Sequence, residues 1–297
     1  DVIVAIGGGS PIDAAKAMWA FYEYPEVTFE QLCTPFSFPK LRQKAKFVAI
    51  PSTSGTATEV TAFSVITDYA KGIKYPLADF EITPDVAIVD PQLVESLPVK
   101  QVAYTGMDAL THAIEAYVST LNSPFTDPLA IKAIEMVLDY LPQSYKCDMD
   151  AREQMHYAQC LAGQAFSNAL LGIVHSMAHP LGAFYDTPHG VANALLLPYV
   201  MEYNAESPAK PKYKAIAKAM GVQGTENMTD EEGVKAAVEA VRKLSLSINI
   251  PQKLHEINVK EEDLKDLSVA AFNDVCTGGN PRETNSDEIL EIYKKAF

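Results

Sequence analysis

The segment "DVIVAIGGGSPIDAAKAM" at residues 1–18 decides the class of fold. Its apolar start predicts a buried strand, and the stretch from Pro11 onward predicts a helix, with three glycines between them. Glycine lets the backbone approach a ligand closely, and the free N–H groups at a helix start attract anions. A tight turn without a ligand is the alternative, but three glycines exceed what a turn needs. We therefore expect a phosphate-binding turn, although its spacing matches neither GxGxxG nor a Walker A motif.

Two further apolar runs extend this pattern toward the C-terminus. Residues 46–50 ("KFVAI") and 85–90 ("DVAIVD") also predict buried strands, because they are short and rich in Val and Ile. From Gln101 onward, helical periodicity replaces the strand pattern, as in "DALTHAIEAYVSTL" and "EGVKAAVEAVRKL". The sequence thus predicts an α/β nucleotide-binding domain over residues 1–97 and an all-helical domain over residues 98–297.

A loop rich in hydroxyl groups follows the second predicted strand. In "PSTSGTATEVT" (51–61), five Ser and Thr side chains surround Gly55. Ligands of open α/β sheets bind at the carboxyl ends of the strands, where this loop must lie. A loop stabilised by its own Ser and Thr side chains explains the composition equally well. Together with the glycine turn, the loop favours a nucleotide site.

Acidic and histidine side chains recur at helical spacing in the predicted helical domain. Asp108 and His112 are four residues apart, as are His175 and His179, and His189 follows after a turn-like Asp-Thr-Pro. Such pairs are often only hydrogen bonds on a helix face. One carboxylate with several imidazoles and no thiolate would suit Fe(II), Zn(II) or Mn(II). A zinc-peptidase motif is excluded, because no Glu follows the first histidine.

Composition limits the other classes of protein. The net charge of −14 and the lack of a Lys/Arg run make nucleic acid an unfavourable partner. No apolar run is long enough to span a membrane, and the start does not resemble a signal peptide. The four cysteines are scattered without a CxxC pair, which indicates a reducing compartment and argues against a disulfide framework and a thiolate zinc site. The cysteines are Cys33, Cys147, Cys160 and Cys276.

Several motifs in order resemble the iron-containing (group III) alcohol dehydrogenases. These are "GGGSPID", "SGTATEVT", "GMDALTHA" and "HSMAHPLG…PHG", with "DVCTGGNPR" at 274–282. The resemblance spans essentially the whole chain. It implies a Rossmann-like nucleotide-binding domain followed by an all-α metal-binding domain of the dehydroquinate synthase type, with the site between them. The implied activity interconverts a small primary alcohol or diol and its aldehyde, in a cytoplasmic homodimer.

The same resemblance assigns roles to the histidines. It implies that Asp108, His112, His175 and His189 bind the metal, either Fe(II) or Zn(II). His179 would face the substrate beside the metal, and either relays the alcohol proton or only orients a neighbour by a hydrogen bond. His156 and His255 match no motif of the family and are expected to be structural or at the surface.

The resemblance also implies a site for NAD or NADP. The implied contact residues are Gly8, Gly9, Ser10, Ser52, Ser54, Thr56, Val65, Lys74 and Leu93. Relatives often carry Thr where Ser52 and Ser54 stand, and both residues keep the hydroxyl group.

The resemblance further implies that the nucleotide-binding domain is N-terminally incomplete. Only three strands are predicted before residue 97, whereas a doubly wound nucleotide sheet normally has about six. We therefore expect these residues to belong to a longer natural chain. Two alternatives to the alcohol dehydrogenase are a zinc-dependent polyol oxidoreductase of the glycerol dehydrogenase type and a binding protein that has lost catalysis.

Overall fold

The computed structural model describes residues 1–68 and 73–297. In the described part of the chain, strands and two helices alternate up to Ala87, and helices follow from Val99 onward. The strands are β1 (Val2–Gly7), β2 (Lys46–Pro51), β3 (Phe63–Asp68), β4 (Ile73–Ala78) and β5 (Val86–Ala87). The first helices are α1 (Gly9–Glu23), α2 (Phe29–Leu32), α3 (Val99–Val118), α4 (Asp127–Tyr145), α5 (Met149–Ala169) and α6 (Ile173–Tyr185). The remaining helices are α7 (His189–Asn204), α8 (Lys212–Ala219), α9 (Asp230–Ser247), α10 (Leu264–Phe272) and α11 (Ser286–Ala296).

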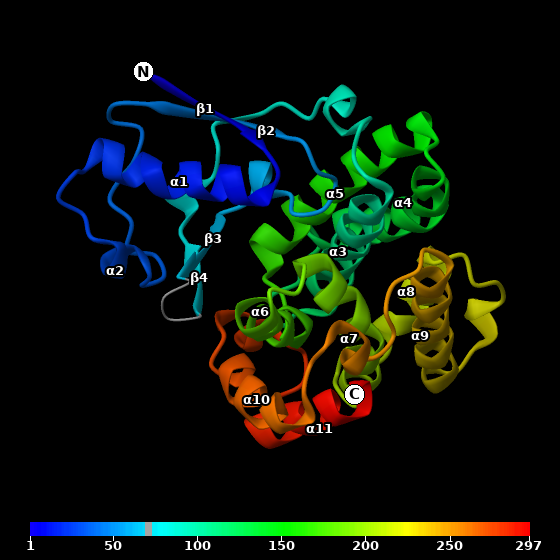
Figure 1. Cartoon of the computed structure of the whole chain (residues 1–297). Helices are drawn as coiled ribbons and strands as arrows, with labels where there is room; N and C mark the ends of the chain where they lie inside the picture. The colour runs from blue at the N-terminus through cyan, green and yellow to red at the C-terminus, as the bar shows by residue number, and fades with distance from the viewer. Residues whose placement is uncertain (69–72) are drawn as a thin grey trace.

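Three parallel strands form a sheet in the order β1–β2–β5, and α1 packs on one of its faces (Figure 1). Trp19 of α1 is fully buried, and its ring stacks on Phe47 of β2 with centroids 5.2 Å apart. The strands predicted at 1–6 and 46–50 are therefore confirmed. Burying two large aromatic side chains contributes several kcal/mol to holding this helix on the sheet.

The prediction of a buried strand at residues 85–90 was wrong in extent and in burial. Only Val86 and Ala87 pair with β2, and both are exposed at the edge of the sheet. The chain then turns, because the Asp90 carboxylate accepts a hydrogen bond from the Gln92 amide and starts a short 3-10 helix. The alternate residues of β1 are also exposed, since Val2 and Val4 lie on the face opposite α1. Apolar composition indicated strands here but not burial on both faces.

An antiparallel hairpin, β3–β4, was not predicted from the sequence. Phe63 pairs with Ala78 and Asp68 with Ile73. Pro76 within β4 cannot donate a ladder hydrogen bond, so this run did not read as a strand. The hairpin matters for the site, because it carries Val65 and Lys74 on neighbouring strands.

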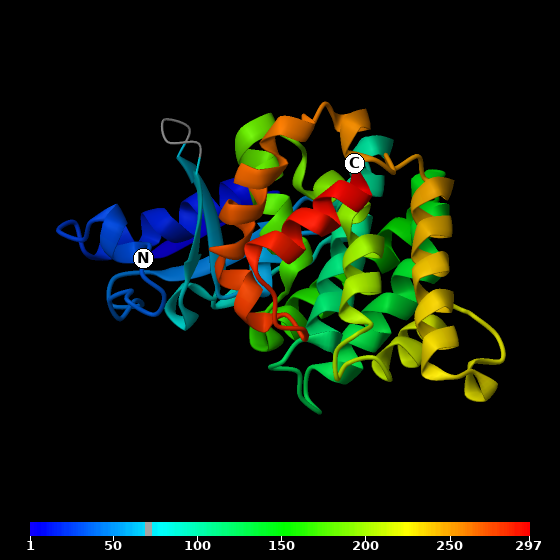
Figure 2. The same ribbon diagram turned by 90° about the horizontal axis from the view of Figure 1, so that it is seen from below.

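The helical part has its own large core and confirms the predicted helical periodicity. The buried residues of α3, α4, α7 and α9 form one continuous hydrophobic cluster. Figure 2 shows the sheet layer on one side of this helical part and α8 and α9 on the opposite side. Among the described residues, no helix is both long and apolar enough to cross a bilayer.

Candidate active site

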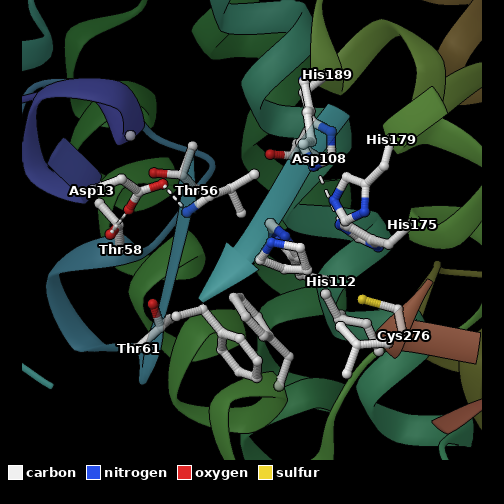
Figure 3. A pocket seen from close by; sticks show the side chains of 18 of the residues that line it. Asp13, Thr56, Thr58, Thr61, Asp108, His112, His175, His179, His189 and Cys276 are labelled. Atoms are coloured by element: carbon white, nitrogen blue, oxygen red, sulfur yellow. Dashed lines mark hydrogen bonds and ion pairs between the residues drawn. The ribbon is translucent and has the colours of Figure 1, made fainter. Parts of the chain in front are cut away.

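A cavity of about 220 Å³ opens where the glycine turn, the hairpin and the helices meet. Both halves of the sequence contribute to its wall (Figure 3). Its lining residues are Gly9, Ser10, Asp13, Thr56, Thr58, Thr61, Phe63, Val65, Thr67, Lys74, Pro76, Asp108, His112, Phe166, Leu170, Leu171, His175, His179, His189, Val275 and Cys276. The two predicted sites thus share one cavity.

Four side chains with metal-binding atoms converge on one side of the cavity. Asp108 and His112 lie one turn apart on α3, His175 comes from the first turn of α6, and His189 begins α7. The Oδ1 atom of Asp108 lies 3.9 Å from Nε2 of His175 and 3.7 Å from Nε2 of His189. One ligand atom from each of the four residues lies within 4.8 Å of the others. The cluster has the dimensions of a metal site.

The chemistry of the four residues also fits a divalent ion. Burial lowers the pKa of His175 and of His189 well below the ordinary value, so both rings are neutral and keep a lone pair. Nδ1 of His112 is buried and finds no hydrogen-bond partner among the described residues. One carboxylate and three imidazoles suit Fe(II) or Zn(II), as expected from the sequence.

Glu115 on α3 holds His175 in position. Its Oε2 atom accepts a hydrogen bond of 2.5 Å from Nδ1 of His175, and its Oε1 atom accepts one of 2.7 Å from the Val174 amide. Because Nδ1 carries the proton in this pair, Nε2 keeps its lone pair for a metal. Burial raises the pKa of Glu115 to about 7, against the lowering effect of the amides at the start of α6. The sequence analysis missed this residue, although it lies one helical turn after His112.

Asn193 on α7 is a second residue that the sequence analysis missed. Its buried Nδ2 atom donates a 2.7 Å hydrogen bond to Oδ1 of Asp108 and lies 3.1 Å from Nε2 of both His175 and His189. The amide therefore contacts three of the four candidate ligands. No motif signalled this residue, because only the packing of α7 on α3 brings it there.

We expect the variant Glu115→Gln to lose metal affinity. The neutral amide keeps the size of the side chain but cannot accept the His175 proton as strongly, so the ring is free to adopt the other tautomer. Loss of such a partner typically weakens metal binding about 10- to 100-fold. Competition with a coloured chelator measures the affinity, and Glu59→Gln, another buried glutamate, is the matched control. Equal affinities in wild type and Glu115→Gln would contradict the role.

His179 stands apart from the four converging residues, although it shares α6 with His175. Its Nδ1 atom donates a 2.7 Å hydrogen bond to Oδ2 of Asp274, and its ring stacks on His189 with centroids 5.4 Å apart. The side chain lines the cavity. Since Nδ1 donates its hydrogen bond to Asp274, Nε2 is free to exchange a proton with a ligand in the cavity. Asp274 was missed as a residue, although it begins the quoted motif at 274–282.

The residues predicted to contact a nucleotide divide into two groups. Five of them line the cavity, namely Gly9, Ser10, Thr56, Val65 and Lys74. Gly8 lies at the N-terminal cap of α1, next to them. A Cβ atom on Gly8 or on Gly9 would lie 3.0 Å from a Thr methyl group of the hydroxyl loop, so the two loops pack closely. This contact explains why glycine is needed there.

The other predicted contacts, Ser52, Ser54 and Leu93, are not among the described residues that line the cavity. The amide of Ser52 donates a hydrogen bond to the Gly7 carbonyl, which ties the two loops together. The buried hydroxyl of Ser54 pairs instead with Nδ1 of His156, at 3.1 Å. Leu93 lies on the 3-10 helix Pro91–Val94. Ser54 therefore directs its hydroxyl into the protein interior.

Asp13 is a further cavity residue that the sequence analysis missed. Its carboxylate accepts hydrogen bonds from the Thr58 hydroxyl, at 2.5 Å, and from the Val65 amide, at 3.0 Å. Burial raises its pKa, although nearby Lys16 opposes the shift. Asp13 thereby joins α1, the hydroxyl loop and β3. Its position in "GGGSPID" was the available signal.

His156 and His255, which were expected to be structural or at the surface, lie outside the cavity lining of the described residues. His255 is exposed and bonds the carbonyl of Phe297. His156 is fully buried in α5, and burial lowers its pKa from 6.5 to about 4.

We expect His156 to make stability fall as the pH falls from 6.5 to 4. Over this interval the unfolded chain takes up a proton that the folded chain does not, so protons favour unfolding. The shift corresponds to roughly 3 kcal/mol as an upper bound. Urea unfolding at pH values on either side of the interval should therefore show a smaller pH-dependent loss for His156→Gln than for wild type. Identical losses in the two proteins would show that His156 does not titrate in this way.

A glycine-rich turn and a carboxylate–histidine cluster on one cavity are the arrangement expected of a metal-dependent dehydrogenase. The chain belongs to the iron-containing alcohol dehydrogenase family. The family model "Iron-containing alcohol dehydrogenase" matches residues 1–91, and the model "Fe-containing alcohol dehydrogenase family, C-terminal" matches residues 102–297. The resemblance seen in the motifs is thus confirmed over almost the whole chain.

Individual relatives agree with the family models. The chain is 59% identical to an NADPH-dependent butanol dehydrogenase of Clostridium saccharobutylicum, over all of this chain and 76% of that protein. It is 47% identical to the lactaldehyde reductase of Escherichia coli K12, over all of this chain and 77% of the relative. A solved structure of 1,3-propanediol oxidoreductase superimposes with a TM-score of 0.95 at 39% identity, over all of this chain and 77% of that one. The fold expected from the sequence is therefore confirmed.

Proposed function

We propose that this protein interconverts a small primary alcohol or diol and its aldehyde by hydride transfer to or from a nicotinamide cofactor, with a metal ion as Lewis acid. The observation that carries the proposal is the shared cavity, since one wall presents the glycine and hydroxyl loops and the other presents the four-ligand cluster. The relatives named as butanol dehydrogenase, lactaldehyde reductase and 1,3-propanediol oxidoreductase support the substrate class. They give no better support to the alternative of a glycerol dehydrogenase-type enzyme.

Asp108, His112, His175 and His189 are the proposed metal ligands. The ion is Fe(II), with Zn(II) as the other candidate, because the donor set contains no thiolate. When bound, such an ion polarises the alcohol or carbonyl oxygen and favours the alkoxide near neutral pH. Nδ1 of His175 is held by Glu115, so its Nε2 atom is positioned before an ion binds. Nδ2 of Asn193 contacts Nε2 of both His175 and His189, so this amide would give way when the two nitrogen atoms bind an ion.

His179 is the proposed catalytic side chain. Its Nδ1 proton is committed to Asp274, which leaves Nε2 to take the alcohol proton or to return it to an aldehyde. Phe166 and the adjacent Leu170 and Leu171 line the same cavity and limit the access of water. Orientation by a hydrogen bond alone is the competing role for His179, and the rate measurements described in the Discussion separate the two.

The nicotinamide cofactor is proposed to lie along the loops of residues 1–97, and residues 98–297 supply the metal ligands. Gly8, Gly9 and Ser10 at the start of α1 would receive the pyrophosphate. The remaining proposed contacts are Ser52, Thr56, Val65, Lys74 and Leu93. Ser54 is left out of this set, because its buried hydroxyl pairs with His156. The name of the Clostridium relative supports NADP, and NAD remains the alternative. Burial lowers the pKa of Lys74, and Asp186 and Asp108 oppose that shift.

We further propose a cytoplasmic homodimer. The cysteines are scattered along the sequence without a CxxC pair, which supports a reducing compartment. Analytical ultracentrifugation tests the dimer.

The function is tested by metal analysis of protein purified without oxygen, together with an aldehyde-reduction screen with NADH and NADPH. We expect about one ion per chain and reduction of small aldehydes that stops on chelation and returns when Fe(II) is added back. A parallel comparison of glycerol with primary alcohols distinguishes the polyol alternative. Full activity after complete removal of metal would exclude the proposed mechanism.

A further inference from the structure

A second group of potential metal ligands lies beside the first. His179, Asp274 and Cys276 each offer one ligand atom, and these atoms lie within 4.8 Å of one another. His179 and Cys276 line the same cavity as the first cluster (Figure 3). The cysteines were too scattered in the sequence to suggest a thiolate site, and only the fold brings this one next to a histidine.

The three residues are held together by their backbone surroundings. Asp274 precedes the 3-10 helix Val275–Gly279, and its Oδ1 atom accepts a 2.9 Å hydrogen bond from the Cys276 amide. Its Oδ2 atom accepts the 2.7 Å bond from His179 of α6. The Thr277 hydroxyl donates a 2.8 Å bond to Ser176, which adds a second connection to α6. These bonds fix Asp274 and the backbone of Cys276 next to His179.

The chemistry of this group differs from that of the first cluster. It combines a sulfur, a nitrogen and an oxygen donor, whereas the first cluster has no sulfur. Soft and borderline cations such as Cd²⁺ and Zn²⁺ prefer a thiolate together with an imidazole. Three protein ligands also leave a fourth position of a tetrahedral ion open toward the cavity.

We propose that His179, Asp274 and Cys276 form a second metal site that binds a soft divalent cation, such as Zn²⁺ or Cd²⁺, separately from the four-ligand cluster. On binding, the Cys276 S–H bond breaks and its proton leaves to solvent, and the Nδ1 proton of His179 leaves as the ring adopts the Nε2–H tautomer. Metal–sulfur and metal–nitrogen bonds form without any change of oxidation state. The carboxylates of Asp108, Glu115 and Asp274 offset the charge of two neighbouring ions.

Occupation of this second site has a consequence that rests on the proposed function. An ion held by His179 and Asp274 replaces the hydrogen bond between them and occupies the cavity wall where substrate would bind. Soft cations should therefore inhibit the dehydrogenase at the level of His179. The binding itself does not depend on that activity.

The test is a Cd²⁺ titration of the full chain carrying its own metal, followed by ultraviolet absorption of the cadmium–thiolate charge-transfer band. We expect one Cd²⁺ per chain to produce the band, because the first cluster contains no thiolate. Cys276→Ser should abolish the band, and Asp274→Asn or His179→Ala should weaken the affinity at least about 10-fold. Cys147→Ser and Cys160→Ser are the controls and should leave the titration unchanged, since these thiols lie outside the group. Far-ultraviolet circular dichroism checks that each variant is folded.

Three results would overturn the proposal. The first is the absence of a band in the wild-type protein, and the second is a band that persists in Cys276→Ser. The third is a cadmium affinity in Asp274→Asn and in His179→Ala that equals the affinity of the wild-type protein. The last result would mean that a single thiol binds cadmium without the other two residues. Failure of the aldehyde-reduction assay would refute the proposed function but would leave the titration interpretable.

Discussion

Replacing His189 by Ala is expected to remove the bound metal and at least about 1000-fold of the activity. The side chain is one of four ligands, and a Lewis acid contributes several kcal/mol to such a reaction. His189 is the most informative ligand to replace, because it begins α7 and its side chain is 30% exposed, so its loss should leave the fold intact. His175→Ala would also empty the site, but it leaves the buried Glu115 carboxylate without its imidazole partner.

Elemental analysis of the purified variant measures the metal, and aldehyde reduction measures the activity. His255→Ala is the matched control, since this histidine is exposed and remote from the cavity, and it should keep both properties. A His189→Ala protein with a full complement of metal would show that the ligand assignment is wrong.

Replacing His179 by Ala is expected to produce the opposite pattern, with metal retained and turnover reduced. Loss of a positioned proton-transfer group typically lowers the rate about 100- to 10,000-fold. Asp274→Asn should give a smaller loss, because the ring remains but its Nδ1 proton is no longer held by a carboxylate. The decrease should be in kcat more than in KM, since His179 acts on the proton and not on the cofactor loops.

Metal content and the two kinetic constants are measured on the same preparations. A fall in kcat of less than about 10-fold in His179→Ala would argue against proton transfer and leave His179 an orienting role alone. A His179→Ala protein without metal would instead show that His179 is a metal ligand and that one of the four assigned ligands is not.

The predictions for the fold were most accurate where the pattern of apolar residues indicated a single type of secondary structure. The helices were foreseen, since periodic apolar residues on α3 to α9 bury one large core. The strand at Lys46–Pro51 was predicted from its short apolar run. That run is apolar because the strand lies between two neighbouring strands and packs Phe47 against Trp19 of α1. The hairpin β3–β4 was not predicted because Pro76, which cannot donate a ladder hydrogen bond, interrupts the strand pattern of the second strand.

The candidate site shows the same division. The spacing of Asp108 and His112 placed both on one face of a helix, and the glycines predicted a close approach of backbone to ligand. Spacing alone would equally have paired His175 with His179. The fold turns His179 toward Asp274 and brings His189 to Asp108, because α7 packs against α3.

The sequence by itself determined the order of an α/β part and a helical part, the family, and the residue types available for a metal and a nucleotide. Local periodicity and short motifs carry this information, since each depends on residues that are near one another in the chain. The tertiary structure alone decided which histidines share a centre, that Glu115 and Asn193 hold them, and that Ser54 turns away from the cavity toward His156. It also brought Cys276 to His179, almost a hundred residues away. These contacts arise from the packing of separate helices, and packing depends on the whole core, which no short stretch of sequence encodes.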